Sequence, residues 1–470
     1  MRSRRKGRLA LSLAGTVLVA AGCGDEPAPT PPYPPGPVVV LAFDGLDPDR
    51  VREYENAGNL PNFARLRERA AVGRVRSTIP MNAATSWTTV ATGVRPGEHG
   101  IWGFGWDTED GSRFATPADR LAPAIWTELA SLGRTARVFG MPLTSSADSA
   151  HGVLAGRSPA ITSAPATGRE DEWLADLRRA RDADLGAAIV HGRASPRPDL
   201  TLVVFSSPAL VQRFFLGGSD PAFERAVRDE YVWCDEVLGR FLDDLGEGGT
   251  LLVCSNRGFG AARWAVSRAA CAALPDGVRV GARPSSFEDG GFTVDTAASP
   301  ADVDAFRAAL EALEHGGERC FRAVHDLRTR DLRGHAAHLG PVLVPEPADG
   351  FTTVPGDLEA PLVAELVGPI RARARRDGYF AIAGPFVEVG PVRDLDLADV
   401  PAIVMHRVGE PIPRRYVHNV PRRLFPLDYF VLRPMKFSGT PNDELRAPSA
   451  SDGPLDEAVA ATVRGLGYVR

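Results

Sequence analysis

Short, continuous apolar runs alternate along this chain with segments in which apolar residues recur at helical spacing. The apolar runs are five to eight residues long and rich in Val, Leu and Ala, which is typical of strands buried on both faces. The predicted strands are residues 38–43, 72–79, 136–140, 200–206 and 250–255. The predicted helices are residues 60–71, 123–132 and 222–245. This alternation predicts an α/β fold with a doubly wound, mostly parallel sheet flanked by helices.

The alternation weakens between residues 261 and 374, where Pro and Gly increase and a predicted helix at 301–315 interrupts irregular sequence. Strand character returns at 378–384, and a helix is predicted near 397–408. We therefore expect a cap subdomain inserted into one α/β core. The expected divisions are a core of residues 38–260 and 375–430, an insertion at 261–374 and a C-terminal extension at 431–470.

The N-terminus has the pattern of an export signal. Residues 1–8 are strongly basic, and the apolar run after them is too short to span a bilayer and closes on Gly22 and Cys23. This is typical of a bacterial lipoprotein signal peptide, residues 1–23, in which Cys23 becomes the lipidated N-terminus. An ordinary signal peptide or a short membrane anchor is the alternative. The Pro-rich residues 24–37 predict an extended, semi-rigid tether.

Composition and charge narrow the expected partners. The 470 residues are 44% apolar and 24% charged, enough for a large core. Removal of the leader deletes five basic residues and shifts the formal charge from −5 to −10. An acidic mature chain is a poor partner for nucleic acid. We expect a membrane-anchored protein of the cell envelope, exported across the cytoplasmic membrane.

Four cysteines remain after Cys23: Cys234, Cys254, Cys271 and Cys320. In an exported protein they could pair in three complete ways that the sequence does not separate. Cys254 ends an apolar run and reads as a small core residue. Cys271 with Cys320 is the pairing to test first.

The sequence TIPMNAATSWTTVATGVRPGEHGIWGF, residues 78–104, resembles the nucleophile segment of the alkaline phosphatase superfamily, in its type I phosphodiesterase/nucleotide pyrophosphatase branch. That branch has a Ser or Thr nucleophile, a Trp-containing helix, a Thr-Gly pair and a Gly-x-His-Gly turn. Counting back from Thr92 and Gly93, the nucleophile position falls on Ala83. The resemblance implies that His99 belongs to a structural turn. LPNFARLRERA, VRDLDLADVPAIVMHRVGEPIP and the terminal LGYVR match further elements of the family, so we expect its fold.

Members of this family hold two divalent metal ions, usually zinc, and the resemblance nominates the ligand positions in this chain. Asp44, in FDGLD after the first apolar run, matches the first metal-binding aspartate. The family's D-x-x-x-H signature aligns with LVVFSSPALVQRFF, which places Ala209 on the aspartate and Arg213 on the histidine. Its Ser-Asp-His-Gly signature aligns with Asn256 and Arg257 in place of Asp and His.

A further family histidine has no counterpart in ARRDGYFAIAGP, so Asp44 alone survives of seven nominated positions. Arg cannot bind a cation, and Asn brings no charge. We therefore expect no cofactor, and no catalytic residue at Ala83. Relative to the family pattern, the substitutions remove two negative charges and add two positive ones, a shift of +4 that equals the charge of two zinc ions. This predicts that Arg213 and Arg257 project into the old metal cavity and pair with Asp44; the alternative is that both turn to solvent.

Three functions remain open at this stage. The first is an inactive, lipid-anchored module that binds a phosphate- or sulfate-type anion through Arg213, Arg257 and Asn82. The second is an active metal-dependent phosphodiesterase or phosphatase that uses Asp44 and relocated ligands, such as the H-x-x-H pair His335 and His338. The third is a structural envelope protein with a salt-bridged pocket.

Overall fold

The computed structural model describes residues 35–440 except 109–110, 145–152, 155–163, 193–195, 247, 275–279, 285–290, 330–339 and 357–358. Cys23, most of the tether, the pair His335 and His338, and the chain after residue 440 lie outside these residues. The central strands are β1 (Val38–Phe43), β2 (Ala70–Arg76), β5 (Ala136–Phe139), β6 (Val153–Leu154), β7 (Leu200–Phe205), β8 (Thr250–Cys254), β19 (Asp377–Ala383) and β20 (Gly390–Asp396).

These eight strands form one sheet in the order β20-β2-β19-β8-β1-β7-β5-β6. β1 lies at its centre, parallel to both β7 and β8, so the predicted α/β core is confirmed. β19 is the exception, because it runs antiparallel to both β2 and β8. The sheet is therefore mixed. The central position of β1 places its carboxyl end, where Asp44 follows, among the ends of its parallel neighbours.

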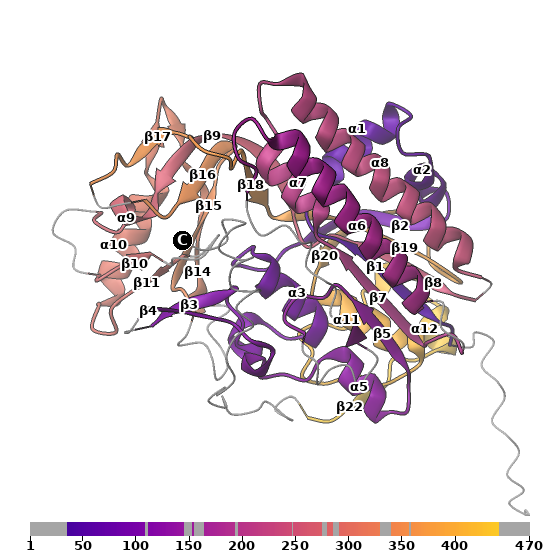
Figure 1. Cartoon of the computed structure of the whole chain (residues 1–470). Helices are drawn as coiled ribbons and strands as arrows, with labels where there is room; N and C mark the ends of the chain where they lie inside the picture. Colours follow the sequence, from indigo (N-terminus) through magenta and orange to yellow (C-terminus); the bar gives the residue numbers. More distant parts are fainter. Residues whose placement is uncertain are drawn as a thin grey trace, which may run out of the picture.

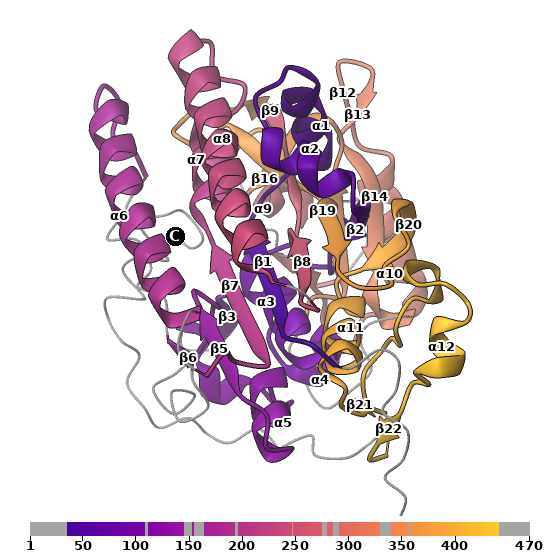
Figure 2. The same ribbon diagram turned by 90° about the vertical axis from the view of Figure 1, so that its right-hand side faces the viewer.

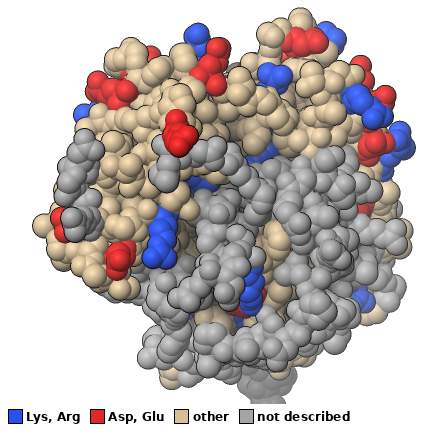
Figure 3. All heavy atoms as spheres, turned by 60° about the vertical axis from the view of Figure 1, so that its left-hand side comes forward, with Lys and Arg blue, Asp and Glu red and all other residues tan. Residues whose placement is uncertain are grey.

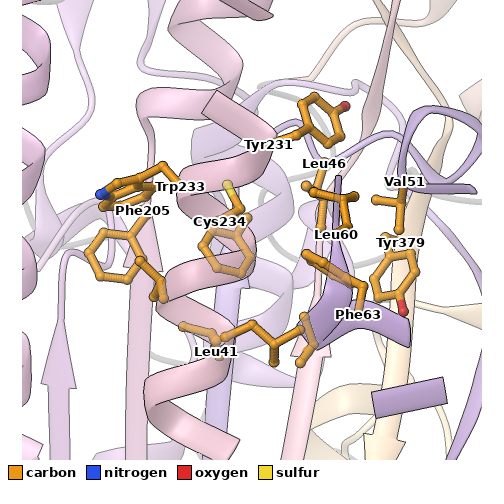
Figure 4. Packing of buried hydrophobic residues seen from close by; sticks show 14 of the residues in the cluster. Leu41, Leu46, Val51, Leu60, Phe63, Phe205, Tyr231, Trp233, Cys234 and Tyr379 are labelled. Atoms are coloured by element: carbon orange, nitrogen blue, oxygen red, sulfur yellow. The ribbon is translucent and has the colours of Figure 1, made fainter. Parts of the chain in front are cut away.

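Helices cover both faces of the sheet (Figures 1 and 2). One face carries α1 (Pro48–Asn56), α2 (Pro61–Arg67), α6 (Glu170–Gly192), α7 (Ser207–Phe215) and α8 (Pro221–Asp244). The other carries α3 (Ala83–Thr92), α5 (Ile125–Ser131) and α11 (Asp399–Val408). Figure 4 shows the first of these layers, in which Trp233 of α8 packs against Phe205 of β7, and Tyr231 and Cys234 of α8 belong to the same buried cluster as Leu41 of β1.

The cap is built from small sheets beside the core. Its strands are β9 (Gly258–Ser267), β10 (Arg283–Pro284), β11 (Phe292–Thr293), β14 (Phe321–Asp326), β15 (Leu343–Pro347), β16 (Gly350–Val354), β17 (Val363–Glu365) and β18 (Ala372–Arg375), with helices α9 (Arg268–Cys271) and α10 (Pro300–Glu311). β9 pairs with β16, β17 and β18. The expected boundary at residue 260 falls inside β9, so one continuous strand links the core to the cap.

Short elements complete the described chain. They are α4 (Pro96–His99), α12 (Tyr429–Leu432), β3 (Gly105–Thr108), β4 (Gly111–Phe114), β12 (Glu314–His315), β13 (Glu318–Arg319), β21 (Ile412–Pro413) and β22 (Phe437–Ser438). Among the described residues, no helix combines the length and the apolar character that crossing a bilayer requires.

Two of the predicted helices are too long. The helix predicted at 60–71 ends at Arg67, and β2 already begins at Ala70, because Ala70 and Ala71 pair with β19 and are buried by it. The helix predicted at 301–315 ends at Glu311, and His315 belongs to a two-stranded ribbon. In both cases pairing with a distant or neighbouring strand overrides local helix propensity.

Candidate functional site

Asp44 lies directly beyond the end of β1, in the interior of the protein. Its backbone N–H donates to the carbonyl of Phe205 at 2.9 Å, which continues the β1–β7 pairing by one residue. The next residue, Gly45, has φ +86° and lies against α7, where a Cβ would come within 2.9 Å of the Cα of Ala209. The close approach of α7 thus requires Gly45, and it sets Ala209 beside the Asp44 turn.

The start of α3 holds the nucleophile position. Asn82 caps this helix, with its side-chain oxygen accepting from the N–H of Thr85 at 2.8 Å. The amide nitrogen of Asn82 donates to the carbonyl of Trp102 at 2.9 Å. Ala83 follows as the first residue of the helix and is buried. Both functional groups of Asn82 are therefore used within the protein, and any contact to an anion would have to compete with them.

Arg257 meets Asp44 in the interior, as the sequence analysis proposed for this arginine. Its Nε donates to Asp44 Oδ1 at 3.1 Å, and its Nη1 donates to the carbonyl of Met81 at 2.9 Å. The guanidinium also lies over the ring of Phe259, 5.1 Å from the ring centroid. The Arg257 side chain is fully buried and that of Asp44 is 2% exposed, so solvent screens this ion pair very little.

Asn256 is joined to both neighbouring elements by its amide. Its Oδ1 accepts from the N–H of Gly45 at 3.3 Å, and its Nδ2 donates to Ser86 Oγ at 3.0 Å. Ser86 Oγ in turn donates to the carbonyl of Asn82 at 2.8 Å, so its hydroxyl hydrogen is already used. Ser86 can then only accept from residue 256, which an amide satisfies and a carboxylate does not. This network suits Asn256 and not the aspartate of the family pattern.

The residues around Asp44 do not fit a zinc ion. Zinc in such centres takes three or more His, Cys, Asp or Glu ligands, and no such group exists among the residues that the structure describes. The positive charge beside Asp44 is instead the guanidinium of Arg257, which would repel a cation. Asn256 has a neutral amide where a metal site would need a carboxylate, and the amide nitrogen donates to Ser86 Oγ.

Helix α7 contributes a network that the sequence analysis missed. Gln212 Nε2 donates to the carbonyl of Gly45 at 2.6 Å, and Gln212 Oε1 accepts from the hydroxyl of Tyr231 at 2.9 Å. The same hydroxyl accepts from the N–H of Asp47 at 3.0 Å. Gln212 and Tyr231 thus hold both sides of the turn that carries Asp44. The available signal in the sequence was Gln212 itself, a polar residue between the motif positions 209 and 213. No sequence pattern indicated that Tyr231 of α8 is its partner.

Arg213 lies on the same helix and is buried, with 3% exposure, so it does not turn to solvent. Its backbone carbonyl accepts from the N–H of Arg371 at 2.8 Å, which ties α7 to the segment that leads into β18. The pairing of Arg213 with Asp44 stays a prediction.

The cap closes over the start of α3. Ile79, Met81 and Trp102 from the core form one buried apolar cluster with three cap residues, Leu327, Val344 and Ala374. Met81 is also the residue whose carbonyl binds Arg257. The nominated positions are all interior as a result, with exposures of 1% for Asp44, 3% for Ala83, 1% for Ala209, 0% for Asn256 and 0% for Arg257.

His99 has a structural place, in keeping with its expected role. Its Nδ1 accepts from the N–H of Ile101 at 3.1 Å, which leaves the proton on Nε2 to donate to Thr89 Oγ1 at 3.0 Å. Burial lowers the pKa of His99 to about 3, so the ring is neutral at physiological pH.

The four described cysteines are buried free thiols, including Cys271 and Cys320, the pair selected for testing. Burial raises the pKa of Cys254 and of Cys271 to about 12. Thiols of this kind are poor nucleophiles and poor metal ligands at neutral pH.

Residues 38–340 match the type I phosphodiesterase/nucleotide pyrophosphatase family. The chain belongs to that family. Solved structures agree on the fold: the inactive threonine-to-alanine variant of murine ectonucleotide pyrophosphatase/phosphodiesterase 5 in complex with AMP is 14% identical, covers 82% of this chain and 96% of its own, and has a TM-score of 0.51. Phosphonoacetate hydrolase from Sinorhizobium meliloti 1021, in complex with phosphonoformate, is 16% identical, covers 80% and 97%, and has a TM-score of 0.58. No curated protein sequence matches the chain.

The structure brings together the segments that the family resemblance nominated. The alkaline-phosphatase-like core, the Asp44 turn, the N-terminus of α3 and the end of β8 converge as the resemblance implied. The groups at that convergence are a carboxylate neutralised by a guanidinium, an amide and an alanine methyl. Among the described residues, no group of three or more His, Cys, Asp or Glu lies there that could hold a metal ion.

Proposed function

We propose that this protein is a non-catalytic member of the phosphodiesterase family that acts as a lipid-anchored envelope scaffold. The observation that carries the proposal is the buried Asp44–Arg257 ion pair at the N-terminus of α3. A permanent cation held by the chain itself neutralises the carboxylate that metal-dependent members would use. Hydrolysis also needs an attacking group in line with phosphorus, and Ala83 supplies none.

The anchor is part of the same proposal. Cys23 at the end of the basic and apolar leader would carry the lipid, and the Pro-rich residues 24–37 would connect it to β1. The protein would then reside in the cell envelope, on the outer side of the cytoplasmic membrane, held by its N-terminus.

Anion binding is a second candidate. It is favoured by the murine relative, whose inactive threonine-to-alanine variant is described in complex with AMP. In this chain Arg213, Arg257 and Asn82 would be the binding groups. The scaffold reading has more support, because Arg257 already contacts Asp44 and Met81 and because both groups of Asn82 are bonded internally. An anion at this place would have to part the apolar contact between Trp102 and the cap.

Metal content and turnover of the purified full-length protein test the proposal together. We expect far less than one zinc per chain, and hydrolysis of bis(4-nitrophenyl) phosphate and 4-nitrophenyl phosphate at the rate of the Asp44→Ala variant. Stoichiometric zinc, together with turnover that Asp44→Ala abolishes, would establish the enzyme alternative with relocated ligands. A variant lacking both His335 and His338 would show whether those residues are the ligands.

Inorganic phosphate distinguishes the two non-catalytic candidates. A ligand that binds only the folded state raises its stability in proportion to the logarithm of its concentration. If the scaffold proposal is right, phosphate should stabilise the protein no more than a sulfate-free salt at the same ionic strength does. A rise that Arg257→Met removes would assign the anion site.

A further inference from the structure

An exposed apolar surface lies at the C-terminal edge of the core, on and around α12. Five large apolar side chains are accessible there, with exposures of 41% for Phe386, 55% for Val389, 78% for Leu427, 77% for Val431 and 42% for Leu432. We call these five residues the α12 patch. Clusters of exposed apolar side chains on a soluble domain usually mark a surface that meets another apolar phase.

The two segments of the patch are held side by side. The N–H of Glu388 donates to the carbonyl of Leu424 at 2.9 Å, and the ring of Phe386 stacks on Tyr429 with centroids 6.4 Å apart. Tyr429 is itself buried, and it stacks on Phe425 at 4.5 Å. The patch therefore rests on an ordered aromatic base within the core.

Phe386 is exposed at a cost in backbone energy. Its φ of +64° lies in the left-handed region, which is an outlier for a bulky residue. Strain of this kind costs on the order of 1–3 kcal/mol and persists where surrounding structure imposes it. Here it holds a ring that stacks on Tyr429 with one side, while the residue stays 41% exposed.

Basic side chains accompany the patch. Residues 420–439 carry four basic residues and one acidic residue, in a chain whose mature charge is −10. Arg422, Arg423 and Lys436 are exposed, and Asp428 is the acidic one. The exposed acidic neighbours on the other segments are Glu388 and Asp394. The cap-side face differs, since its described surface shows acidic and basic side chains intermingled (Figure 3).

The described chain begins at this same edge. Pro35 lies against Gly409, within 2.7 Å of where a Cβ of that glycine would be, and the Nη2 of Arg433 lies 3.4 Å from the same point. Arg433 directly follows α12. The twelve residue steps from Cys23 to Pro35 can span at most about 40 Å. A membrane that holds Cys23 therefore lies within about 40 Å of Pro35, at the edge that carries the α12 patch.

We propose that the α12 patch docks onto the surface of an anionic lipid bilayer, the membrane to which Cys23 is anchored. The inference rests on the anchor in the proposed function. Leu427, Val431 and Leu432 would enter the interface between headgroups and acyl chains, while Arg422 and Lys436 meet lipid phosphates. The tether would then fold down along the core instead of holding it away from the membrane.

The test uses the full-length lipoprotein reconstituted in vesicles of phosphatidylglycerol and phosphatidylcholine. Val431→Cys and, as the matched control, Val367→Cys are each labelled with an environment-sensitive fluorophore. Val367 is 86% exposed and follows β17 of the cap, a strand that lies on the opposite side of the molecule from α12 (Figure 1). The four natural cysteines of the described chain are buried and do not compete for the label. We expect a blue shift and quenching by brominated lipids at 431 and neither at 367.

Arg422→Gln with Arg423→Gln measures the electrostatic part. At about 1 kcal/mol per basic residue, removing both should lower the ratio of docked to undocked label about 30-fold. If the protein floats with the vesicles but the fluorophores at 431 and 367 both report a water environment, membrane docking is overturned and the lipid anchor is supported. Failure to float would overturn both. A blue shift at 431 that grows with protein concentration in the absence of vesicles would assign the patch to a second copy of the chain and also overturn membrane docking.

Discussion

Replacing Arg257 by Met is the most direct perturbation of the buried Asp44–Arg257 ion pair. Met preserves much of the apolar volume over Phe259 and removes the guanidinium that donates to Asp44, so the buried carboxyl of Asp44 loses this partner. Breaking a buried pair by removing one partner costs about 3–5 kcal/mol. The carbonyl of Met81 also loses its donor, which acts in the same direction. We expect Arg257→Met to destabilise the fold by about 4 kcal/mol.

A double-mutant cycle isolates the pair itself. Asp44→Asn keeps an oxygen that can accept from Arg257, so it should cost less than Arg257→Met, about 1–3 kcal/mol. The double variant removes both charges of this ion pair. Its loss of stability should fall short of the sum of the two single losses by about 2 kcal/mol.

Urea unfolding, followed by far-ultraviolet circular dichroism and by Trp fluorescence, measures the free energies from the midpoint and slope. The matched control is Arg74→Met, which breaks an ion pair between Arg74 and Asp49 whose side chains are 40% and 47% exposed. Exposed pairs of this kind contribute about 0–1 kcal/mol. If Arg257→Met costs no more than Arg74→Met, the Asp44–Arg257 pair does not stabilise the centre and the reasoning fails.

Three further predictions follow from the site. Ala83→Ser should leave hydrolysis of bis(4-nitrophenyl) phosphate at background, because a hydroxyl without metal ligands is not activated; turnover above background would contradict this. Burial lowers the pKa of His99 in the folded protein to about 3, below its ordinary value of 6.5. Between these two pH values the unfolded state therefore binds more protons, and the free energy of unfolding falls as the pH drops from 6.5 towards 3. The contribution of His99 to this slope is about 1.4 kcal/mol per pH unit. Urea unfolding of the His99→Gln variant across that pH range should lack this contribution. An unchanged slope in the variant would show that His99 is not a buried neutral ring. A thiol-reactive reagent should modify none of the four described cysteines in the native protein and all of them after denaturation without reductant, whereas a disulfide between Cys271 and Cys320 would leave two unreactive.

The sequence was sufficient where one signal dominated. The apolar runs of β1, β7 and β8 allow few alternatives to buried strands, and the structure has them within a residue of the predicted bounds. α6 was missed because Glu170–Gly192 is polar and lacks a clear apolar stripe. β20 was missed because its sequence, GPVRDLD, has strand character only beside β2.

The same contrast holds in the site. The pairing of Asp44 with Arg257 follows from charge once both residues are placed at the ends of neighbouring strands. The bonds of Asn256 to Ser86 and of Gln212 to Tyr231 depend on how α3, α7 and α8 pack, which no local pattern encodes. The charge pair could therefore be predicted from the sequence, whereas the hydrogen-bond partners that depend on helix packing could not.

The position of β19 also sets the order in which this protein can assemble. The strand lies between β2 and β8, and Ala383 pairs with Ala70 across more than half of the chain. Until β19 has been synthesised, β2 and β20 cannot join the parallel strands, and β8 presents an open edge. Contacts of such long sequence separation form slowly and expose apolar strands in the meantime. A growing chain therefore remains incomplete until residues near 383 emerge, and a truncation before that point should yield no folded core.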